Sequence, residues 1–318
     1  MTDVLDPQPL DTFEGDATVV APSAEAFGGE RYYVDIFGYN EMKNTVDREH
    51  KNILEIDLLQ NLITTLVKHE STGTLPAFIS STQPEITDDD KRLRLSVHSP
   101  VELHLYDSLN RHTGPVPNPD PASDFDIYEE EIPNSYYWRL GEGQYAGVGG
   151  NTSTTITLQG LALGTFTFDV EELAGGDVAT TTVYEDIPVA TTTIATLVAG
   201  GGVVPLLLLD IDGDGTADTE VTPGGLTSEE LVGIVKGLVK TLNLPQKKEE
   251  QLLQRLTKLE RELTKEHKKE RIEKLKTRLA FAKVIRLISL YEKRKLLTKD
   301  EAVELITMLE NIRSMVVQ

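Results

Sequence analysis

The densest group of potential ligand side chains lies in the stretch 206–218, which reads Leu-Leu-Leu-Leu-Asp-Ile-Asp-Gly-Asp-Gly-Thr-Ala-Asp. Acidic residues fall at positions 1, 3, 5 and 9 of a calcium-loop pattern, namely Asp210, Asp212, Asp214 and Asp218. Gly215 takes the sharp-turn position 6, and Thr216 takes position 7, which supplies a backbone carbonyl. Hard oxygen ligands at this spacing suit Ca²⁺. The alternative is a bare acidic turn, but carboxylates this close repel one another unless a cation lies among them.

The loop differs from a calmodulin-type EF-hand at position 12, where Val221 replaces the bidentate glutamate. The pattern therefore resembles the calcium loops of dockerins and thrombospondin type 3 repeats, which belong to extracellular proteins. This resemblance implies Ca²⁺ as the cofactor and an extracellular or cell-surface location. The predicted metal ligands are Asp210, Asp212, Asp214, Thr216 and Asp218.

An acid and a base that could act together occur near the N-terminus. Asp16 lies in a Gly-Asp turn, and His50 follows a predicted strand at Arg31–Phe37. Apolar residues then recur at helical spacing up to Leu66, which predicts a helix directly after the histidine. In a catalytic triad, the acid orients the imidazole, and the imidazole takes the proton from the nucleophile.

The order of Gly-Asp turn, strand, histidine and helix resembles the C-terminal end of an α/β-hydrolase, in particular the lipase and lecithin-cholesterol acyltransferase-like group. The Gly-Asp-Ala-Thr-Val run at 15–19 is similar to the motif that carries the triad acid there, which implies Asp16 as acid and His50 as base. The sequence contains no Gly-x-Ser-x-Gly elbow, so the nucleophile is absent. We expect residues 1–70 to be the end of a hydrolase domain whose N-terminal half, with its signal peptide, is missing. The alternative is an ordinary turn aspartate and a surface histidine.

Three further histidines, His98, His104 and His112, raise the question of a transition-metal site. On one continuous strand, His98 and His104 would share a face but lie about 20 Å apart by the rise per residue. This separation is too large for one ion. We therefore expect the three histidines at surface or edge positions.

Composition limits the remaining possibilities. The 318 residues allow two or three domains, and an apolar content of 39% supports ordinary cores. The net charge is −21, but the residues from Leu226 onward carry +7 and those before it carry −28. The acidic part disfavours nucleic acid as a partner and favours cations. The absence of cysteine excludes disulfides and thiolate metal sites. No apolar run reaches the roughly 18 residues that a membrane helix needs.

Residues 91–208 carry the pattern of a β-sandwich. Leu93, Leu95 and Val97 alternate with polar residues, and the alternation resumes at Val101 after a Ser-Pro bend. Later short runs separated by glycine and proline favour antiparallel strands. The segment 99–114 resembles immunoglobulin-like modules of bacterial secreted proteins. A polar linker is expected at 71–90 and the calcium loop at 209–222.

Residues 226–318 are predicted to form amphipathic helices. Thr227 with Glu230, and later Thr298 with Glu301, form capping boxes. Short helices joined by tight turns pack as an antiparallel bundle. The run that starts at Leu296 resembles the FIMAH-type helical module of bacterial extracellular proteins, which implies attachment or interaction rather than catalysis. A coiled-coil oligomer is the competing interpretation, but chain breaks keep each heptad run short.

The expected fold class is therefore multidomain α and β, with the truncated end of an α/β-hydrolase, an antiparallel β-sandwich and a C-terminal antiparallel helical bundle. Two functions fit these features. The first is the C-terminal part of a secreted calcium-binding ester or lipid hydrolase, or acyltransferase-like protein, inactive by itself. The second is a non-enzymatic extracellular adhesion or scaffold protein stabilised by calcium. The expected partner is the missing hydrolase half or a cell-surface component.

Overall fold

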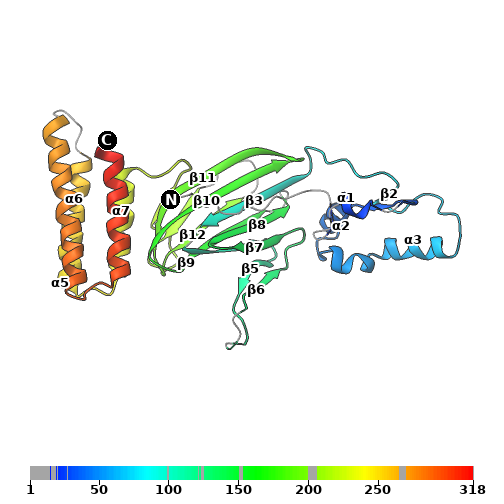
Figure 1. Cartoon of the computed structure of the whole chain (residues 1–318), viewed down its shortest axis with the longest axis horizontal. Helices are drawn as coiled ribbons and strands as arrows, with labels where there is room; N and C mark the ends of the chain where they lie inside the picture. The colour runs from blue at the N-terminus through cyan, green and yellow to red at the C-terminus, as the bar shows by residue number, and fades with distance from the viewer. Residues whose placement is uncertain are drawn as a thin grey trace.

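The computed structural model describes residues 15, 19, 21–26, 28–98, 100–120, 122, 125–149, 153–199, 206–264 and 270–317. A small N-terminal region, a pair of β-sheets and a group of helices follow one another along the long axis (Figure 1). The mixed α and β content, the antiparallel sheets and the C-terminal helices confirm the predicted class at this level. No described helix combines the length and the apolar character needed to cross a membrane.

The N-terminal region is mainly helical. Its elements are α1 (Ala21–Ala24), β1 (Tyr33–Val34), α2 (Ile36–Lys43), the 3-10 helix η1 (His50–Glu55), α3 (Asp57–Val67) and β2 (Ile79–Ser80). Of the strand predicted at Arg31–Phe37, only the two residues of β1 are in a strand. β1 ends at Val34 because the next residue, Asp35, caps α2: its side chain accepts a hydrogen bond from the Gly38 amide (2.8 Å). β2 lies within the predicted linker 71–90 and pairs with β1.

The described strands of the central region form two antiparallel sheets. The five-stranded sheet has the order β11-β10-β3-β8-β7, and the seven-stranded sheet has the order β14-β13-β12-β9-β4-β5-β6. The strands are β3 (Lys91–His98), β4 (Val101–Asp107), β5 (His112–Val116), β6 (Ile127–Glu130), β7 (Tyr136–Leu140), β8 (Gly143–Gly149), β9 (Thr154–Gly160), β10 (Gly164–Ala174), β11 (Asp177–Val189), β12 (Ile194–Ala199), β13 (Leu207–Asp210) and β14 (Thr219–Val221).

Both sheets contribute to one apolar core. Leu95 and Val97 of β3 are fully buried, while the residues between and beside them are partly exposed, as the two-residue period of a strand predicts. The chain then changes sheets, and Leu103 and Leu105 of β4 enter the same buried cluster. The alternation visible in the sequence therefore selects the face of each strand that is buried.

A buried glutamine connects the two sheets. Gln144 of β8 is 2% exposed. Its side-chain oxygen accepts hydrogen bonds from the Leu103 amide on β4 (2.9 Å) and from the Tyr137 hydroxyl (2.7 Å). Its side-chain nitrogen donates to the Val101 carbonyl. Because both polar groups of the buried amide have partners, the link stabilises the contact between the sheets.

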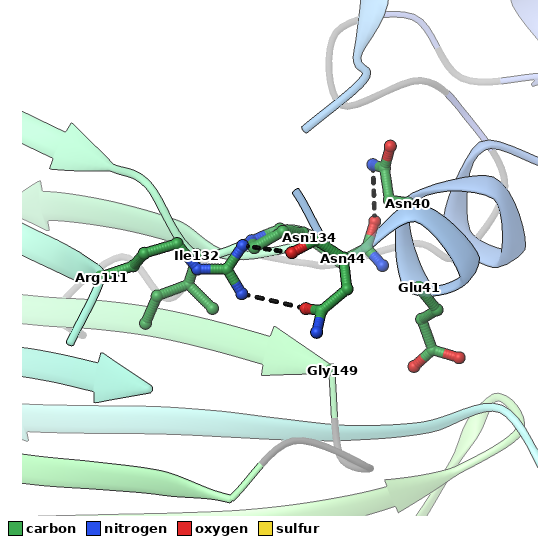
Figure 2. Close-up of a pocket in the computed structure, with 8 residues that line it drawn as sticks. Asn40, Glu41, Asn44, Arg111, Ile132, Asn134 and Gly149 are labelled. Atoms are coloured by element: carbon green, nitrogen blue, oxygen red, sulfur yellow. Dashed lines mark hydrogen bonds between the residues drawn. The ribbon is translucent and has the colours of Figure 1, made fainter. Parts of the chain in front are cut away.

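A polar network holds α2 against the sheets beside a small pocket (Figure 2). The side chain of Asn40, which is 1% exposed, donates to the side-chain oxygen of Asn134 (2.9 Å). Asn134 in turn donates to the Phe37 carbonyl (3.2 Å). Arg111 donates to the carbonyl (2.7 Å) and the side-chain oxygen (3.0 Å) of Asn44. The pocket has a volume of about 250 Å³.

The described C-terminal region contains the helices α4 (Ser228–Thr241), α5 (Gln246–Leu263), α6 (Glu270–Lys293) and α7 (Lys299–Val317). α4 contacts α5 and α7, and α6 contacts the same two helices, so the contacts form a closed ring. The predicted capping box is present at the start of α4. The Thr227 amide donates to Glu230 (2.8 Å), and the Glu230 amide donates to the Thr227 hydroxyl (3.3 Å).

The buried face of α6 differs from the expected one. The helical spacing in the sequence predicts one apolar face that includes Leu275, Leu279 and Ile288, but Leu275 and Leu279 are 57% and 51% exposed. Ile288 is buried as predicted, together with Phe281 and Tyr291, which the prediction did not include. α6 carries apolar residues on more than one face, and the face with the larger aromatic side chains is the one that packs against its neighbours.

Candidate metal centre

The predicted calcium loop connects β13 and β14 at the edge of the seven-stranded sheet. Leu209 pairs with Thr219, so the loop closes between Asp210 and Asp218. The Asp218 amide donates to the Leu209 carbonyl (2.7 Å), and an Asp218 carboxylate oxygen accepts a hydrogen bond from the Ile211 amide (2.8 Å). These bonds anchor the loop directly on the sheet.

Asp210 organises the backbone of the loop. It is 7% exposed, and its carboxylate oxygens accept hydrogen bonds from the amides of Gly213 (2.7 Å) and Gly215 (2.8 Å). Both glycines have positive φ angles, 76° and 88°, which residues with a side chain rarely adopt. A Cβ on Gly213 would also lie 2.9 Å from the Thr192 carbonyl oxygen. The two glycines thus allow the backbone to wrap around one carboxylate.

Three aspartates of the described loop converge. Carboxylate oxygens of Asp210, Asp212 and Asp218 all lie within 4.8 Å of one another, close enough to hold one metal ion. Asp214 does not belong to this group, and one of its oxygens accepts a hydrogen bond from the Thr216 amide (2.8 Å). The structure therefore shows an acidic cluster suited to a cation. Ca²⁺ itself, and the roles of Asp214 and the Thr216 carbonyl as ligands, stay predictions.

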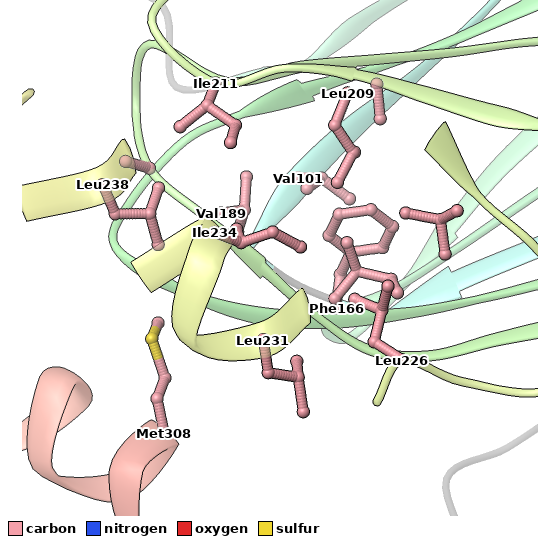
Figure 3. Packing of buried hydrophobic residues seen from close by; sticks show 14 of the residues in the cluster. Val101, Phe166, Val189, Leu209, Ile211, Leu226, Leu231, Ile234, Leu238 and Met308 are labelled. Carbon is pink, nitrogen blue, oxygen red and sulfur yellow. The ribbon is translucent and has the colours of Figure 1, made fainter. Parts of the chain in front are cut away.

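Sequence reasoning missed the residue between the first two acidic ligands. Ile211 is 5% exposed, and its carbonyl accepts hydrogen bonds from the hydroxyls of Thr192 (2.8 Å) and Thr193 (3.3 Å). Its side chain belongs to the same buried cluster as residues of α4 (Figure 3), and a Cβ on Gly237 would lie 3.0 Å from its Cδ1. The available signal was one apolar residue within an acidic loop, since such a residue needs a buried place.

The acid and base predicted near the N-terminus are not brought together by any described contact. Asp16 lies outside the described residues. His50 is exposed and begins η1, where the side chains of Glu49 and Asn52 form a capping box. The pairing of Asp16 with His50 therefore stays a prediction.

The histidines of the sheets are arranged differently from the expectation. His98 ends β3 in the five-stranded sheet, where its ring lies edge-on to Tyr145 at 6.3 Å. His104 on β4 and His112 on β5 face each other, with Nδ1 of the first 3.0 Å from Nε2 of the second. The expectation was based on the spacing along one continuous strand and did not include the pairing of β4 with β5. The turn residues Ser-Leu-Asn at 108–110 were the signal for that hairpin.

No family model, curated protein or solved structure matches this chain. The chemistry of the aspartate loop is therefore argued from its own geometry. That geometry provides hard oxygen ligands on a backbone held by hydrogen bonds. It also places the buried side chain of Ile211 against α4.

Proposed function

We propose that this chain is a non-enzymatic, extracellular adhesion or scaffold protein in which Ca²⁺ at the aspartate loop stabilises the junction between the sheets and the helices. The observation that carries the proposal is the position of Ile211. It lies between Asp210 and Asp212 in the sequence and packs at Gly237 of α4. A cation that fixes the two aspartates also fixes the residue that contacts the helix.

Electrostatics gives the cation a clear role. Three carboxylates within 4.8 Å of one another repel when they are ionised, and Asp210 is also buried. A divalent cation converts this repulsion into attraction and keeps the loop in one conformation. In a chain without disulfides, an ion bound by three aspartates of one loop would fix the conformation of that loop at the edge of the sheet.

Two pockets lined by described residues are small. The pocket between α2 and the sheets has a volume of about 250 Å³, and a second pocket beside Phe125 and Tyr128 has about 90 Å³. Pockets that bind small organic ligands usually have volumes of roughly 300–1,000 Å³. Neither pocket contains His50.

Calcium-dependent thermal unfolding tests the proposal. Chelator-treated protein is melted with and without Ca²⁺, and a concentration of about 100 times Kd is expected to add about 2.7 kcal/mol of stability. For a chain of this size, this corresponds to a rise of roughly 4 °C in melting temperature. The variant carrying both Asp212→Asn and Asp218→Asn should lose the rise. An unchanged melting curve of the wild-type protein at millimolar Ca²⁺ would refute the site.

An esterase assay separates the scaffold from the hydrolase interpretation. The full chain is expected to show no hydrolysis of short acyl esters above the uncatalysed rate. Activity that persists through repurification and is lost in His50→Ala would contradict the scaffold function and reveal a nucleophile that the sequence motif did not identify.

A further inference from the structure

Two histidines and two glutamates lie in a row on the outer face of the seven-stranded sheet, away from the aspartate loop. Glu102 and His104 are on β4, His112 is on β5 and Glu129 is on β6. Glu102 and His104 occupy the partly exposed positions of β4, which alternate with its fully buried core residues. Because three adjacent strands hold the four side chains, a rigid frame sets their spacing.

The four side chains make contacts in one line. Nδ1 of His104 lies 3.0 Å from Nε2 of His112. The outer nitrogen of His112 lies 3.2 Å from Glu129, and the outer nitrogen of His104 lies 3.6 Å from Glu102. Gly114 leaves space for the arrangement, since a Cβ there would lie 3.1 Å from Nε2 of His112. The order along the line is therefore carboxylate, imidazole, imidazole, carboxylate.

The protons on the two rings decide what lies between the inner nitrogens. Two neutral imidazoles carry two N–H groups. If His104 donates to His112 and His112 donates to Glu129, both short contacts are hydrogen bonds, and the outer nitrogen of His104 faces Glu102 at 3.6 Å without a proton. If both rings donate outward to the carboxylates, two lone pairs face each other at 3.0 Å. A metal ion between the inner nitrogens suits this second arrangement.

An aromatic side chain packs beside both histidines. The ring of Tyr106 stacks on His104 at a centroid distance of 6.4 Å and lies tilted beside His112 at 4.9 Å. The two ligand rings are thus held in place by aromatic contacts as well as by the carboxylates.

We propose that Nδ1 of His104 and Nε2 of His112 bind a divalent transition-metal ion of the zinc or copper type, with Glu102 and Glu129 orienting the two rings. Two nitrogens bound to one ion at about 2.0 Å lie roughly 2.8 Å apart in square-planar geometry and roughly 3.3 Å apart in tetrahedral geometry. The observed 3.0 Å falls between these values. Imidazole ligands select such ions over Ca²⁺, which takes oxygen ligands. Water completes the coordination.

Zinc binding to the full chain tests this proposal. Chelator-treated protein, with excess Ca²⁺ present to occupy the aspartate loop, is titrated with ZnCl₂ in a calorimeter. One Zn²⁺ per chain is expected, with binding weakened at least about ten-fold in His104→Asn, in His112→Asn and in Glu129→Gln. His98→Asn, on the other sheet, and Asp212→Asn, in the loop, are the matched controls and should bind as the wild type does.

A second readout covers variants that fail to fold. Cu²⁺ bound to the wild-type protein should show coordination by two nitrogens in its electron paramagnetic resonance spectrum. Three results would overturn the proposal: no saturable zinc binding up to a concentration of about 1 mM, folded histidine variants that bind as tightly as the wild type, or a copper spectrum without nitrogen coupling. Any of these would mean that the two rings form a hydrogen-bonded pair only.

Discussion

Ile211 of the aspartate loop packs against α4 at Gly237, where a Cβ would lie 3.0 Å from Cδ1 and 3.1 Å from Cγ2 of the isoleucine. Asp210 and Asp212 flank Ile211 in the sequence, and both belong to the converging carboxylates. A shift of the loop backbone at Ile211 therefore reaches α4 directly, without an intervening side chain.

Alanine at two glycines of α4 measures this contact. Gly233→Ala should raise the free energy of unfolding by about 0.5–1 kcal/mol, because alanine favours the helix and its Cβ would meet no described atom within 4 Å. The free energy of unfolding of Gly237→Ala should be at least about 1 kcal/mol lower than that of Gly233→Ala, because the added Cβ crowds Ile211. Urea unfolding compares the two variants. Equal stabilities would show that Ile211 moves aside without cost.

Single substitutions distinguish the aspartates of the loop. Asp212 is one of the three converging residues, whereas Asp214 accepts a hydrogen bond from the Thr216 amide. Asp212→Ala should therefore remove most of the rise in melting temperature caused by Ca²⁺, and Asp214→Ala should retain more than half of it. Calorimetric melts with and without Ca²⁺ give both values. An equal loss in the two variants would show that Asp214 turns inward when the ion binds, as the sequence pattern predicts.

Removal of the buried amide should weaken the contact between the sheets. Gln144→Ala leaves the Leu103 amide and the Val101 carbonyl without their side-chain partner. At about 1–3 kcal/mol for each unsatisfied buried group, we expect a loss of roughly 2–4 kcal/mol in the free energy of unfolding. Gln159→Ala on the exposed face of β9 is the control, with an expected change within about 0.5 kcal/mol. Similar urea midpoints for both variants would contradict the role of Gln144.

Asp47 should make stability depend on pH. Its carboxylate accepts hydrogen bonds from the Asn134 amide (3.0 Å) and the Asn40 side chain (3.2 Å), and burial raises its pKa to about 6. Since the folded pKa exceeds the ordinary value of 3.8, the stabilising contribution is present below that value and is lost as the pH rises through 6.

Asp47→Asn keeps a side-chain oxygen for both donors but cannot ionise. The variant and the wild type should therefore have similar stability at about pH 4, and the variant should be more stable by about 1–2 kcal/mol at about pH 7.5, after allowance for solvent screening. Thermal melts across this range measure the difference, with the exposed Asp177→Asn as control. A constant difference between wild type and Asp47→Asn at all pH values would rule out titration of Asp47.

Local features of the fold could be predicted from the sequence because few residues decide them. The aspartate loop closes within nine positions, and the capping box at Thr227 depends on a residue three positions later. By contrast, α2 was not predicted, since its sequence Ile-Phe-Gly-Tyr-Asn has no clear helical period and its start depends on the cap at Asp35.

The remaining features depend on contacts between distant or paired segments. The approach of His104 to His112 requires the register of β4 with β5 and the space left by Gly114. The packing of Ile211 requires α4 to return to the end of the sheet. The hydrophobic period of α6 does not decide which of its apolar faces the neighbouring helices cover. Residue types alone do not determine these relationships.

The position of Trp138 makes the two main regions separately observable. It is the single tryptophan of the chain, it lies on β7, and its ring stacks on Tyr136 with a centroid distance of 4.6 Å. Tryptophan fluorescence therefore reports on the sheets, whereas far-ultraviolet circular dichroism is dominated by the long helices α4–α7. Comparison of the two signals during unfolding, with and without Ca²⁺, shows whether the ion merges the regions into one cooperative transition.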